Sequence, residues 1–558
     1  MHPYFAPDFE VKISGLTMAA DVRNAVIDLS CESSLDQAGM FKLTLDNRDL
    51  RLTDSPLLNV GKTVEIHMGY ANDLQPKMLG EIVAVQPSFP SSGAPTIVIT
   101  GYDKSHRMRN NKPARFTYKM MNDTAIAAII AAENLLIPVV DPSPFPARES
   151  VQQLGSDWAL LTELAERNYF QLYVWWDRLY FRFQRPQTEK VVLEWGKNLS
   201  SFSPRLSTSG QFGIQEIRGW NAELAEQIVA ILPSVSLGTD IDDIVERLGS
   251  GIVDQLVTMG RNVVRSQPVE TQFDALMLAK SLLLQLIQGL YEATGSCIGI
   301  PMMKAGDVVE IRGIGKRFSG NYTLTRVTHS ISKSGYRTDF EMSQRHSGSL
   351  AQLLRSKISG ESASLDRSSK SQPMGGMTIG KVVNNLDTKG LGRVQLSFPY
   401  LSDVNLSAWA RVASPWAGSS NGIYFLPDID DECLVTFEQG DINKPIVIGS
   451  LWNGKNRPLD VNAGLNEKKI IKTKTGMQVT FDETKGNESL ALTDGKGSSV
   501  TLNAVTGVLA IKAKGNVKIE DGAGSSIVLD ANTKKITIEA KGDVEIKSAA
   551  SGKIKLNP

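Results

Sequence analysis

Residues 536–558 read ITIEAKGDVEIKSAASGKIKLNP, and their pattern governs the whole segment from residue 470 to the last residue, 558. Aliphatic residues come in pairs two positions apart, and successive pairs begin 8 to 11 residues apart. Residues two positions apart on a strand point to the same face, and the stretches between pairs hold the Gly, Asp, Asn and Ser of tight turns. The intervening strand positions are mostly Lys, Glu, Thr or Ser. The pattern predicts a meander of short strands with one thin apolar row on one face and a solvated opposite face.

This apolar row has no second layer in its own segment, because no aromatic residue, cysteine or helical pattern follows Phe481. Symmetric oligomers bury self-complementary faces, so further copies of the chain would cover the row. The pattern therefore predicts an intermolecular β-prism, although it does not set the number of chains. A single-chain β-solenoid is the alternative, but a hexapeptide solenoid needs a repeat of six residues. The residues predicted to line the interior between chains are Val517, Ile519, Ile527, Leu529, Ile536, Ile538, Val544, Ile546, Ile554 and Leu556.

The composition of the 558 residues excludes several classes of protein. Lys plus Arg (60) equals Asp plus Glu (60), so no net charge recruits nucleic acid or an anionic membrane. The three cysteines are far apart and odd in number, which argues against a disulfide framework. The first ten residues lack the basic end and apolar run of a signal peptide. The most apolar helical stretch, residues 275–290, is interrupted by polar residues and is expected to be a buried helix. We therefore expect a chain made in the cytoplasm without a signal peptide.

The first 346 residues alternate between strand and helix patterns. Residues 9–102 form short alternating runs typical of a small β-barrel. Helical spacing follows in DTAIAAIIAAENLL and in SDWALLTELAERNYF, where Ser156 or Asp157 is the expected N-cap. Three more helical segments are predicted between residues 222 and 290, before strands return at residues 306–343. This half of the chain is predicted to be α+β.

Residues 377–458 form a compact unit of five or six short strands, which is typical of an OB-type barrel. OB barrels often bind nucleic acid, but this unit holds seven basic and eight acidic residues. A groove that follows phosphates needs the opposite balance, so nucleic acid is not an expected partner.

The same unit closely resembles the spike OB domain of VgrG proteins, phage tail spikes and extracellular contractile injection systems. The resemblance runs through GKVVNNLDTKGLGRVQLSFPYL and SAWARVASPWAGSSNGIYFLPDIDDECLVTFEQGDINKPIVIGSLWNGKNRP. The N-terminal half is similar to the hub of those proteins and of phage late-control D proteins, in GYDKSHRMR and DWALLTELAERN. The motif residues of the OB domain are Gly392, Arg393, Phe398, Pro399, Trp409, Arg411, Gly418, Glu432, Gly440, Asp441 and Gly449.

The resemblance implies a mainly β fold: an α+β hub of β-barrels with inserted helices, an OB-fold barrel and a C-terminal intermolecular triple-stranded β-helix. It divides the chain into 1–105 (first hub barrel), 106–200 (helix-containing insertion), 201–346 (second hub barrel with helices), 347–376 (linker), 377–458 (OB domain) and 459–558 (needle). It further implies a homotrimeric spike of an injection particle, with a hexameric inner tube protein and baseplate proteins above it. A PAAR-type tip protein would cap the needle, which would make transient contact with a target membrane. Only residues 459–469 separate the barrel from the first needle strand, so we expect no inserted lysozyme-like domain. Pro558 comes two residues after the last aliphatic pair, so we also expect no fused effector domain.

Candidate catalytic and metal-binding residues are few. The five histidines form no HxH or HExxH group, and the sequence holds no CxxC motif, so neither a metal nor another cofactor is expected. The acidic run DIDDE, residues 428–432, could supply paired carboxylates, but the resemblance places it in a turn before a barrel strand. Trp409, Trp416 and Trp452 could stack on a sugar; in so small a barrel they are expected in the core. The alternatives to a structural spike are a cell-wall-degrading enzyme and a carbohydrate-binding adhesin built on a β-solenoid.

Overall fold

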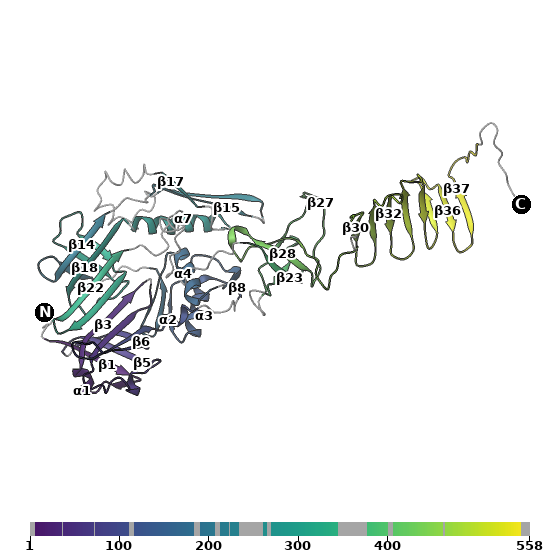
Figure 1. The fold of residues 1–558 in the computed structure, drawn as a ribbon. Helices are drawn as coiled ribbons and strands as arrows, with labels where there is room; N and C mark the ends of the chain where they lie inside the picture. Colours follow the sequence, from purple (N-terminus) through teal and green to yellow (C-terminus); the bar gives the residue numbers. More distant parts are fainter. Residues whose placement is uncertain are drawn as a thin grey trace. The chain divides into compact units, whose positions relative to one another are not determined.

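The computed structural model describes residues 6–35, 37–71, 73–110, 117–153, 155–183, 190–206, 212–221, 224–233, 260–264, 269, 271–288, 290–343, 376–399, 406–460 and 464–547 (Figure 1). The chain divides into two compact units, Met1–Leu451 and Trp452–Pro558. Strands hold 49% of the described residues and helices 12%, which confirms the predicted mainly β fold class.

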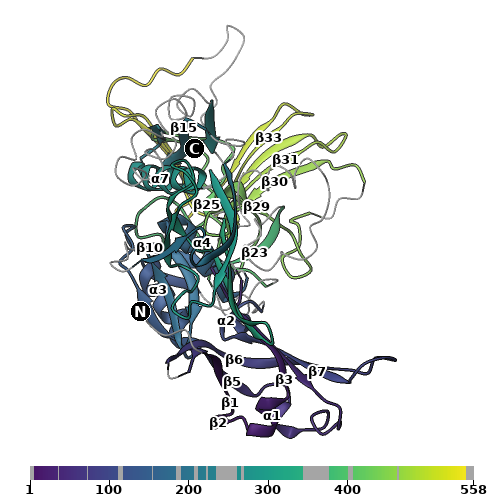
Figure 2. The ribbon, with the colours of Figure 1, turned by 90° about the vertical axis from the view of Figure 1, so that its left-hand side faces the viewer.

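The hub is built on an 11-stranded sheet in which every neighbouring pair is antiparallel. Its strands, in sheet order, are β14 (Leu199–Leu206), β18 (Tyr291–Ile298), β22 (Gly335–Ser343), β21 (Arg326–Ser332), β3 (Val26–Ser34), β4 (Met40–Asp46), β7 (Thr96–Asp103), β6 (Asp73–Ser88), β5 (Thr63–Tyr70), β1 (Pro7–Ile13) and β2 (Leu16–Thr17). Pairing of β21 with β3 joins strands from the two predicted hub barrels in one sheet. Figure 2 shows β1, β2, β5, β6 and β7 gathered around the short helix α1 (Ala20–Asn24).

Two apolar clusters fill the inner faces of this sheet, because its strands alternate inward apolar and outward polar residues. One cluster centres on Phe41 and Ile66, the other on Phe340 and Val327. The apolar residues of the alternating sequence pattern are therefore the buried residues of these strands, and the polar residues between them are the more exposed ones.

Two hub helices begin where the sequence predicts. Asn122 caps α3 (Asp123–Glu133), and Ser156 caps α4 (Asp157–Asn168) by accepting a hydrogen bond from the Ala159 N–H at 3.1 Å. Of the two predicted N-cap candidates, Ser156 and Asp157, the structure has Ser156 in this position. In the described parts of the hub, the further helical elements are η1 (Pro56–Leu58), α2 (Ser105–Met108) and α7 (Gln272–Gln288); η3 (Glu438–Gly440) lies in the OB barrel. Ala275, Ala279 and Leu283 of α7 are fully buried, as predicted for this apolar helix. Among the described residues, no helix combines the length and the hydropathy needed to cross a membrane.

Smaller sheets complete the hub. They are β8 (Thr117–Met121) with β10 (Arg148–Gln152); β11 (Gln171–Trp175), β12 (Arg178–Arg182) and β9 (Ile137–Val140); β13 (Val191–Glu194), β19 (Val308–Arg312) and β20 (Gly320–Thr323); and β16 (Glu226–Pro233), β15 (Ile214–Asn221) and β17 (Arg261–Val264).

The first of the three helices predicted after residue 222 is wrong. Residues 226–233 form strand β16, which pairs with β15 over its whole length and buries Ile228 and Ala230. The apolar face supplied by β15 and α7 outweighs the helix propensity of the segment. The second predicted helix and the linker at residues 347–375 lie outside the described residues.

The OB barrel holds a five-stranded sheet in the order β24 (Gln395–Ser397), β23 (Thr378–Asn384), β28 (Glu432–Phe437), β29 (Pro445–Ser450) and β25 (Arg411–Val412). Beside it lies a two-stranded hairpin, β26 (Ala417–Gly418) with β27 (Asn421–Gly422). Val394, Cys433 and Val435 are fully buried at the centre of its core. Residues 423–427, which follow β27, form no strand.

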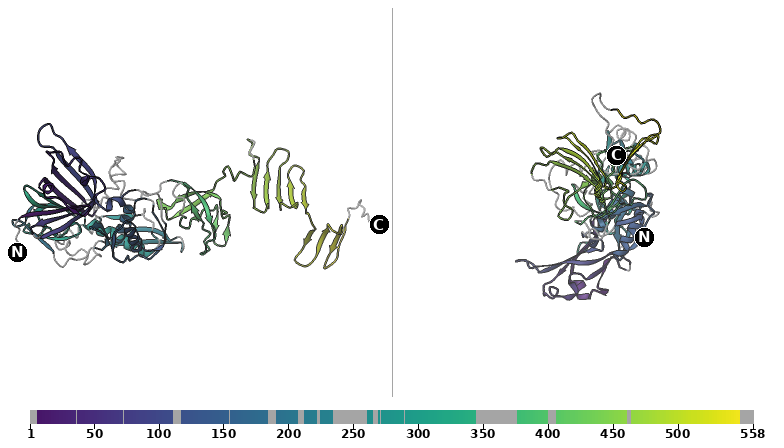
Figure 3. Two further views of the ribbon diagram at one scale, coloured as in Figure 1. Left: turned by 90° about the horizontal axis from the view of Figure 1, so that it is seen from below. Right: turned by 90° about the vertical axis from the view of Figure 1, so that its right-hand side faces the viewer.

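Over residues 464–547, the described part of its β region, the C-terminal unit forms two meanders that no second layer covers (Figure 3). The first is β30 (Lys468–Lys472), β31 (Gln478–Asp482), β32 (Ser489–Thr493), β33 (Ser499–Asn503) and β34 (Leu509–Lys512); the second is β35 (Val517–Glu520), β36 (Ser526–Asp530) and β37 (Lys535–Glu539). We call residues 464–547 the needle segment. The prediction of a strand at Val544 and Ile546 is wrong, since no strand forms there, and Ile554 and Leu556 lie outside the described residues.

Two buried polar side chains of the hub sheet hold the loop at residues 299–305. Lys77 Nζ donates a hydrogen bond to the Pro301 carbonyl, and His329 Nε2 donates to the Met303 carbonyl at 2.8 Å. Burial lowers the pKa of Lys77 from its ordinary value near 10.5 to about 7, and it also lowers the pKa of His329. Burial therefore disfavours the charged form of both side chains, so protonating either of them destabilises the folded hub.

The Lys77 shift predicts a pH-dependent hub stability. Between pH 7 and 10.5 the unfolded chain holds a proton on Lys77 that the folded chain lacks, so stability should rise with pH by up to about 1.4 kcal/mol per pH unit. Urea unfolding of wild type and Lys77→Met, followed by tryptophan fluorescence at pH 7, 8 and 9, isolates this contribution. The wild-type free energy of unfolding should rise relative to that of Lys77→Met; parallel pH profiles would contradict the assignment.

Candidate functional site

The aliphatic pairs of the needle segment lie opposite one another on neighbouring strands, so they form one continuous apolar row on each meander. In β31–β34, Val479 faces Leu492, Leu492 faces Val500, Val500 faces Ile511, Phe481 faces Leu490, Leu490 faces Leu502, and Leu502 faces Leu509. In β35–β37, Val517 faces Leu529, Leu529 faces Ile536, Ile519 faces Ile527, and Ile527 faces Ile538. Six of the predicted interior residues thus share one face of the second meander.

This apolar row is uncovered. No side chain of the described needle residues 464–547 is buried, and Leu509, Ile536 and Ile538 are 61%, 67% and 57% exposed. Monomeric soluble proteins rarely expose a contiguous apolar surface of this kind, and such surfaces mark interaction sites. The row is therefore the candidate functional site of the C-terminal unit.

The turns of the needle segment repeat, a feature that the pair spacing alone does not reveal. Residues 494–520 (DGKGSSVTLNAVTGVLAIKAKGNVKIE) and 521–547 (DGAGSSIVLDANTKKITIEAKGDVEIK) are two copies of one 27-residue pattern. Asp494 Oδ1 accepts hydrogen bonds from the N–H groups two and four residues on at 2.7 and 2.9 Å, and Asp521 Oδ1 does the same at 2.9 and 2.8 Å. These bonds hold the pKa of both carboxyl groups below the usual range. Alignment of the segment against itself would have found the repeat from the sequence.

Asp387 and Arg393 form the best-defined motif contact of the OB barrel. The Arg393 guanidinium donates to both carboxylate oxygens of Asp387 at 2.9 Å, and the Leu391 N–H donates to the same carboxylate at 3.1 Å. The Asp387 side chain is 3% exposed and that of Arg393 is 12% exposed. The Arg393 hydrogen bonds hold the pKa of Asp387 well below its usual range. Arg393 also lies over the ring of Trp409, 5.5 Å from its centroid.

The remaining motif residues serve the barrel in different ways. Phe398 packs against Phe437 in the core, and Gly392 and Gly440 adopt positive φ angles of 67° and 83° that favour glycine. Glu432, the last residue of the DIDDE run, begins β28. Pro399, Arg411, Gly418 and Gly449 are exposed.

Asp441 organises a contact that the sequence did not reveal. Its Oδ1 accepts a hydrogen bond from the Asn443 N–H at 2.9 Å, and Asn443 Oδ1 accepts one from the Gln152 N–H of the hub at 2.7 Å. The Leu406 carbonyl accepts from Gln152 Nε2 at 3.3 Å and from Thr117 Oγ1 at 3.2 Å. The edge of the β8–β10 sheet is thus joined to the barrel through polar groups far apart in sequence.

The prediction that all three barrel tryptophans lie in the core is wrong for two of them. Trp416 and Trp452 are 56% and 61% exposed, whereas Trp409 is half-buried beside Arg393. Trp416 lies next to the β26–β27 hairpin, followed by the exposed Tyr424 and Phe425. We call Trp416, Tyr424 and Phe425 the barrel aromatic patch.

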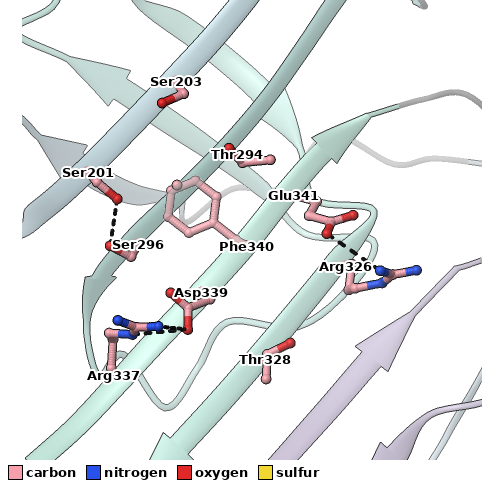
Figure 4. Close-up of a pocket in the computed structure, with 11 residues that line it drawn as sticks. Ser201, Ser203, Thr294, Ser296, Arg326, Thr328, Arg337, Asp339, Phe340 and Glu341 are labelled. Carbon is pink, nitrogen blue, oxygen red and sulfur yellow. Dashed lines mark hydrogen bonds and ion pairs between the residues drawn. The ribbon is translucent and has the colours of Figure 1, made fainter.

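A polar pocket of about 340 Å³ lies on the face of β14, β18, β21 and β22 (Figure 4). Its charged groups pair with one another: Arg337 with Asp339 at 2.7 Å, and Arg326 with Glu341 at 3.5 Å. The pocket therefore offers no uncompensated charge to a ligand. Within the described ranges, no group of three or more His, Cys, Asp or Glu residues is placed to hold a metal ion, and Cys31, Cys297 and Cys433 are buried free thiols.

Comparison with protein families gives two matches. The Type VI secretion system/phage-baseplate injector OB domain matches residues 378–452, within the predicted barrel of 377–458. The Alg8 N-terminal domain matches residues 7–333, which is more than half of the chain.

Individual proteins that are similar to this chain include spike proteins of the Type VI secretion system. The Type VI secretion system spike protein VgrG3 of Vibrio cholerae is 28% identical over 129 residues, 22% of this chain and 13% of that protein. The spike protein VgrG1a of Pseudomonas aeruginosa is 30% identical over 118 residues, 20% of this chain and 18% of that protein. The chain thus spans less than a fifth of the length of these relatives.

Among solved structures, a chain of the lidded Francisella PdpA-VgrG complex is similar in fold, with a TM-score of 0.53 and 10% identity over 91% of this chain and 80% of that one. The half-lidded form gives a TM-score of 0.51 and 10% identity over 91% and 88%. The Alg8 N-terminal domain model covers more than half of the chain, so the chain belongs to that family; it also carries the injector OB domain and is similar to VgrG-like spike proteins.

Proposed function

We propose that three copies of the chain form the central spike of an injection particle, join its inner tube to a piercing tip and puncture the target envelope. The observation that carries this proposal is the uncovered apolar row of the needle segment. Three such rows facing one axis would remove their aliphatic side chains from water, which stabilises by roughly 25 cal/mol for each Å² of apolar surface buried. The association would also occupy strand edges that otherwise invite unwanted pairing.

A second surface supports self-association. The barrel aromatic patch exposes Tyr424 by 76% and Phe425 by 69%. Aromatic residues of this size are enriched at interfaces between proteins. We assign this patch to the contact between barrels of neighbouring copies.

The expected partners follow from the same proposal. A hexameric inner tube protein and baseplate proteins would bind the hub, a PAAR-type tip protein would bind the needle end, and contact with the target membrane would be transient. The chain would be made in the cytoplasm and then assembled into the particle. Charged side chains on the outer strand positions, such as Lys518 and Glu520, suit a rod that passes through water.

The proposed role is mechanical and not catalytic. Two of the relatives are named spike proteins. A third is named an actin cross-linking toxin, VgrG1, and its similarity covers 110 residues, 10% of that protein. Clearing of a peptidoglycan zymogram by the purified chain would overturn this part of the proposal.

The native mass of the purified chain tests the trimer directly. Light scattering should give three times the 60.8 kDa of one chain. A folded species of 60.8 kDa whose needle segment resists protease would instead support a single-chain β-solenoid, and with it an enzyme or adhesin.

A further inference from the structure

The loop of residues 299–305 joins β18 to β19 and is held by side chains from two separate parts of the hub sheet. In the first predicted barrel, the Tyr70 hydroxyl of β5 donates a hydrogen bond to the Gly299 carbonyl at 2.8 Å, and Lys77 of β6 donates to the Pro301 carbonyl. In the second, the loop is held by side chains of β21 and β22, which β3, β4 and β7 separate from β5 and β6 in the sheet. The 299–305 loop therefore ties the two parts of the sheet together.

His329 of β21 can hold this loop only in its neutral form. Its Nε2 lies 2.8 Å from the Met303 carbonyl, which can only accept, so Nε2 carries the ring proton. Nδ1 is then the acceptor, and the hydroxyl groups of Tyr336 and Thr338 lie 2.7 and 3.2 Å from it. Thr338 Oγ1 in turn accepts a hydrogen bond from the Ile300 N–H at 3.1 Å. The neutral imidazole thus belongs to a chain of hydrogen bonds that ends on the loop backbone.

A second proton on His329 would break this chain. Nδ1 would become a donor, so the hydroxyl groups of Tyr336 and Thr338 would lose their common acceptor. The imidazolium would also be buried, because His329 is only 3% exposed. Burial and the nearby charge of Lys77 lower the pKa of His329 well below its ordinary value, although the Met303 carbonyl favours the charged ring. Acid therefore weakens the attachment of the loop to the sheet.

The titratable groups around His329 and Lys77 come from five strands and from the loop. They are Cys31 on β3, Tyr70 on β5, Asp73 on β6, Cys297 on β18, Tyr336 on β22, and Lys304 and Asp307 before β19. The charges of Asp73 and Asp307 act on Lys77, whereas the charge that acts on His329 is that of Lys77. In the described part of the hub, no carboxylate therefore offsets a proton on the imidazole ring.

We propose that the 299–305 loop is an acid-sensitive contact between the two parts of the hub, which opens locally when His329 is protonated. Proteins commonly open one element without unfolding globally, and a histidine that gains a proton in acid can drive such a change. This contact lies within one chain, so it does not depend on trimer formation.

The two cations contribute in different pH ranges. Lys77, whose pKa in the folded hub is about 7, is charged in both the closed and the open state at lower pH, so it adds no further pH dependence there. His329 should take up its proton in the open state below its ordinary pKa of about 6.5 and stay neutral in the closed state. The open population should therefore grow by up to about tenfold for each pH unit below about 6.5.

The thiol of Cys297 reports the opening in the wild-type chain. It is buried, and its Sγ lies 4.0 Å from Sδ of Met303 in the loop. Full-length protein is labelled with methyl methanethiosulfonate at pH 7, 6 and 5, and peptide mass spectrometry measures each cysteine separately. Each rate is divided by the rate of the same cysteine in the urea-unfolded chain at the same pH, because thiol reactivity itself depends on pH. The normalised Cys297 rate should rise by up to about tenfold between pH 6 and 5, whereas that of Cys433 in the OB barrel core should stay constant.

Low concentrations of urea separate local opening from unfolding of the hub. Release of one short loop exposes little surface, so the Cys297 rate at pH 5 should hardly change when a little urea is added. A rate that climbs steeply with urea would show that the whole hub unfolds, and it would overturn the local opening.

His329→Gln tests whether the imidazole proton is responsible. The glutamine amide can donate to the Met303 carbonyl but does not titrate, so the normalised Cys297 rate should be the same at pH 7 and pH 5. His106→Gln is the matched control, since the Nδ1 of this hub histidine lies 2.7 Å from the Asp103 carbonyl and not from a carbonyl of the loop. It should keep the wild-type pH dependence.

Three results would overturn the proposal: a wild-type Cys297 rate that does not rise in acid, an equal rise at Cys433, or a pH dependence that persists in His329→Gln. If His329→Gln does not fold, the wild-type comparison of Cys297 with Cys433, together with its urea dependence, decides the question.

Discussion

Replacing Ile538 with Asp is expected to abolish assembly of the needle. Ile538 faces Ile527 on the uncovered row and is 57% exposed in one chain, so it is available to a neighbouring copy. In the trimer the variant would place three carboxylates around one axis, out of water and close together, where like charges repel strongly. Burying an unpaired charge costs several kcal/mol, and each 1.4 kcal/mol is a factor of about ten in an equilibrium constant.

Thr537→Asp is the matched control, because Thr537 lies between Ile536 and Ile538 and points to the opposite face of β37. Limited trypsin digestion with mass spectrometry reports cleavage after Lys535 and Lys541. Cleavage in Ile538→Asp should be more than about tenfold faster than in wild type, as the open population grows, whereas Thr537→Asp should keep the wild-type rate. Equal protection of both variants would show that the aliphatic row does not face the axis.

Asp387→Ala is expected to destabilise the OB barrel by about 3–5 kcal/mol, because it leaves the nearly buried Arg393 guanidinium without its carboxylate. The lost hydrogen bonds also release the loop that leads into β24. Asp430→Asn is the control: Asp430 is 72% exposed, and its ion pair with Lys381 at 2.7 Å is a surface contact worth roughly 0–1 kcal/mol. Urea unfolding at pH 7 gives both values. Similar losses for the two variants would contradict the structural role of Asp387.

The Asp387 carboxylate also makes the stability of the barrel fall at acidic pH. Its pKa lies below the ordinary value near 3.9 in the folded barrel, so the unfolded chain takes up the proton first as the pH falls. The stability contributed by Asp387 is therefore fully present above about pH 4 and is lost as the pH falls further. Asp387→Ala should show a shallower loss of stability over this acid range than wild type.

Local patterns in the sequence located most of the elements, because they depend on nearest neighbours. Alternation gave the hub strands, Ser156 identified the start of α4, and residues 377–458 contain the matched OB domain. The prediction of three helices between residues 222 and 290 was wrong at residues 226–233, which form a strand because β15 and α7 cover the segment, and the sequence does not place these two elements beside it.

Contacts between residues far apart in the sequence could not be predicted from local sequence patterns. Gln152 meets Asn443, and Lys77 meets Pro301, across separations of 291 and 224 residues. Neither contact is marked by a local sequence pattern. An amide or an ammonium group is predicted to be exposed at the surface unless its neighbours in the fold are known. The exposure of Trp416 and Trp452 could not be predicted from the sequence either, because it depends on the direction in which the loops that carry them run from the barrel.

The sequence by itself determined that the C-terminal strands carry one apolar face, because side-chain direction alternates along any strand and depends on no distant partner. Only the tertiary structure decided the registers that place those residues opposite one another, and the interruption between β34 and β35. Register and strand partnership arise from hydrogen bonds between backbone segments, and the backbone is chemically the same in every residue but proline. The side chains therefore determine which face of the needle strands must be buried, whereas the register and the pairing partner of each strand are determined only in the folded structure.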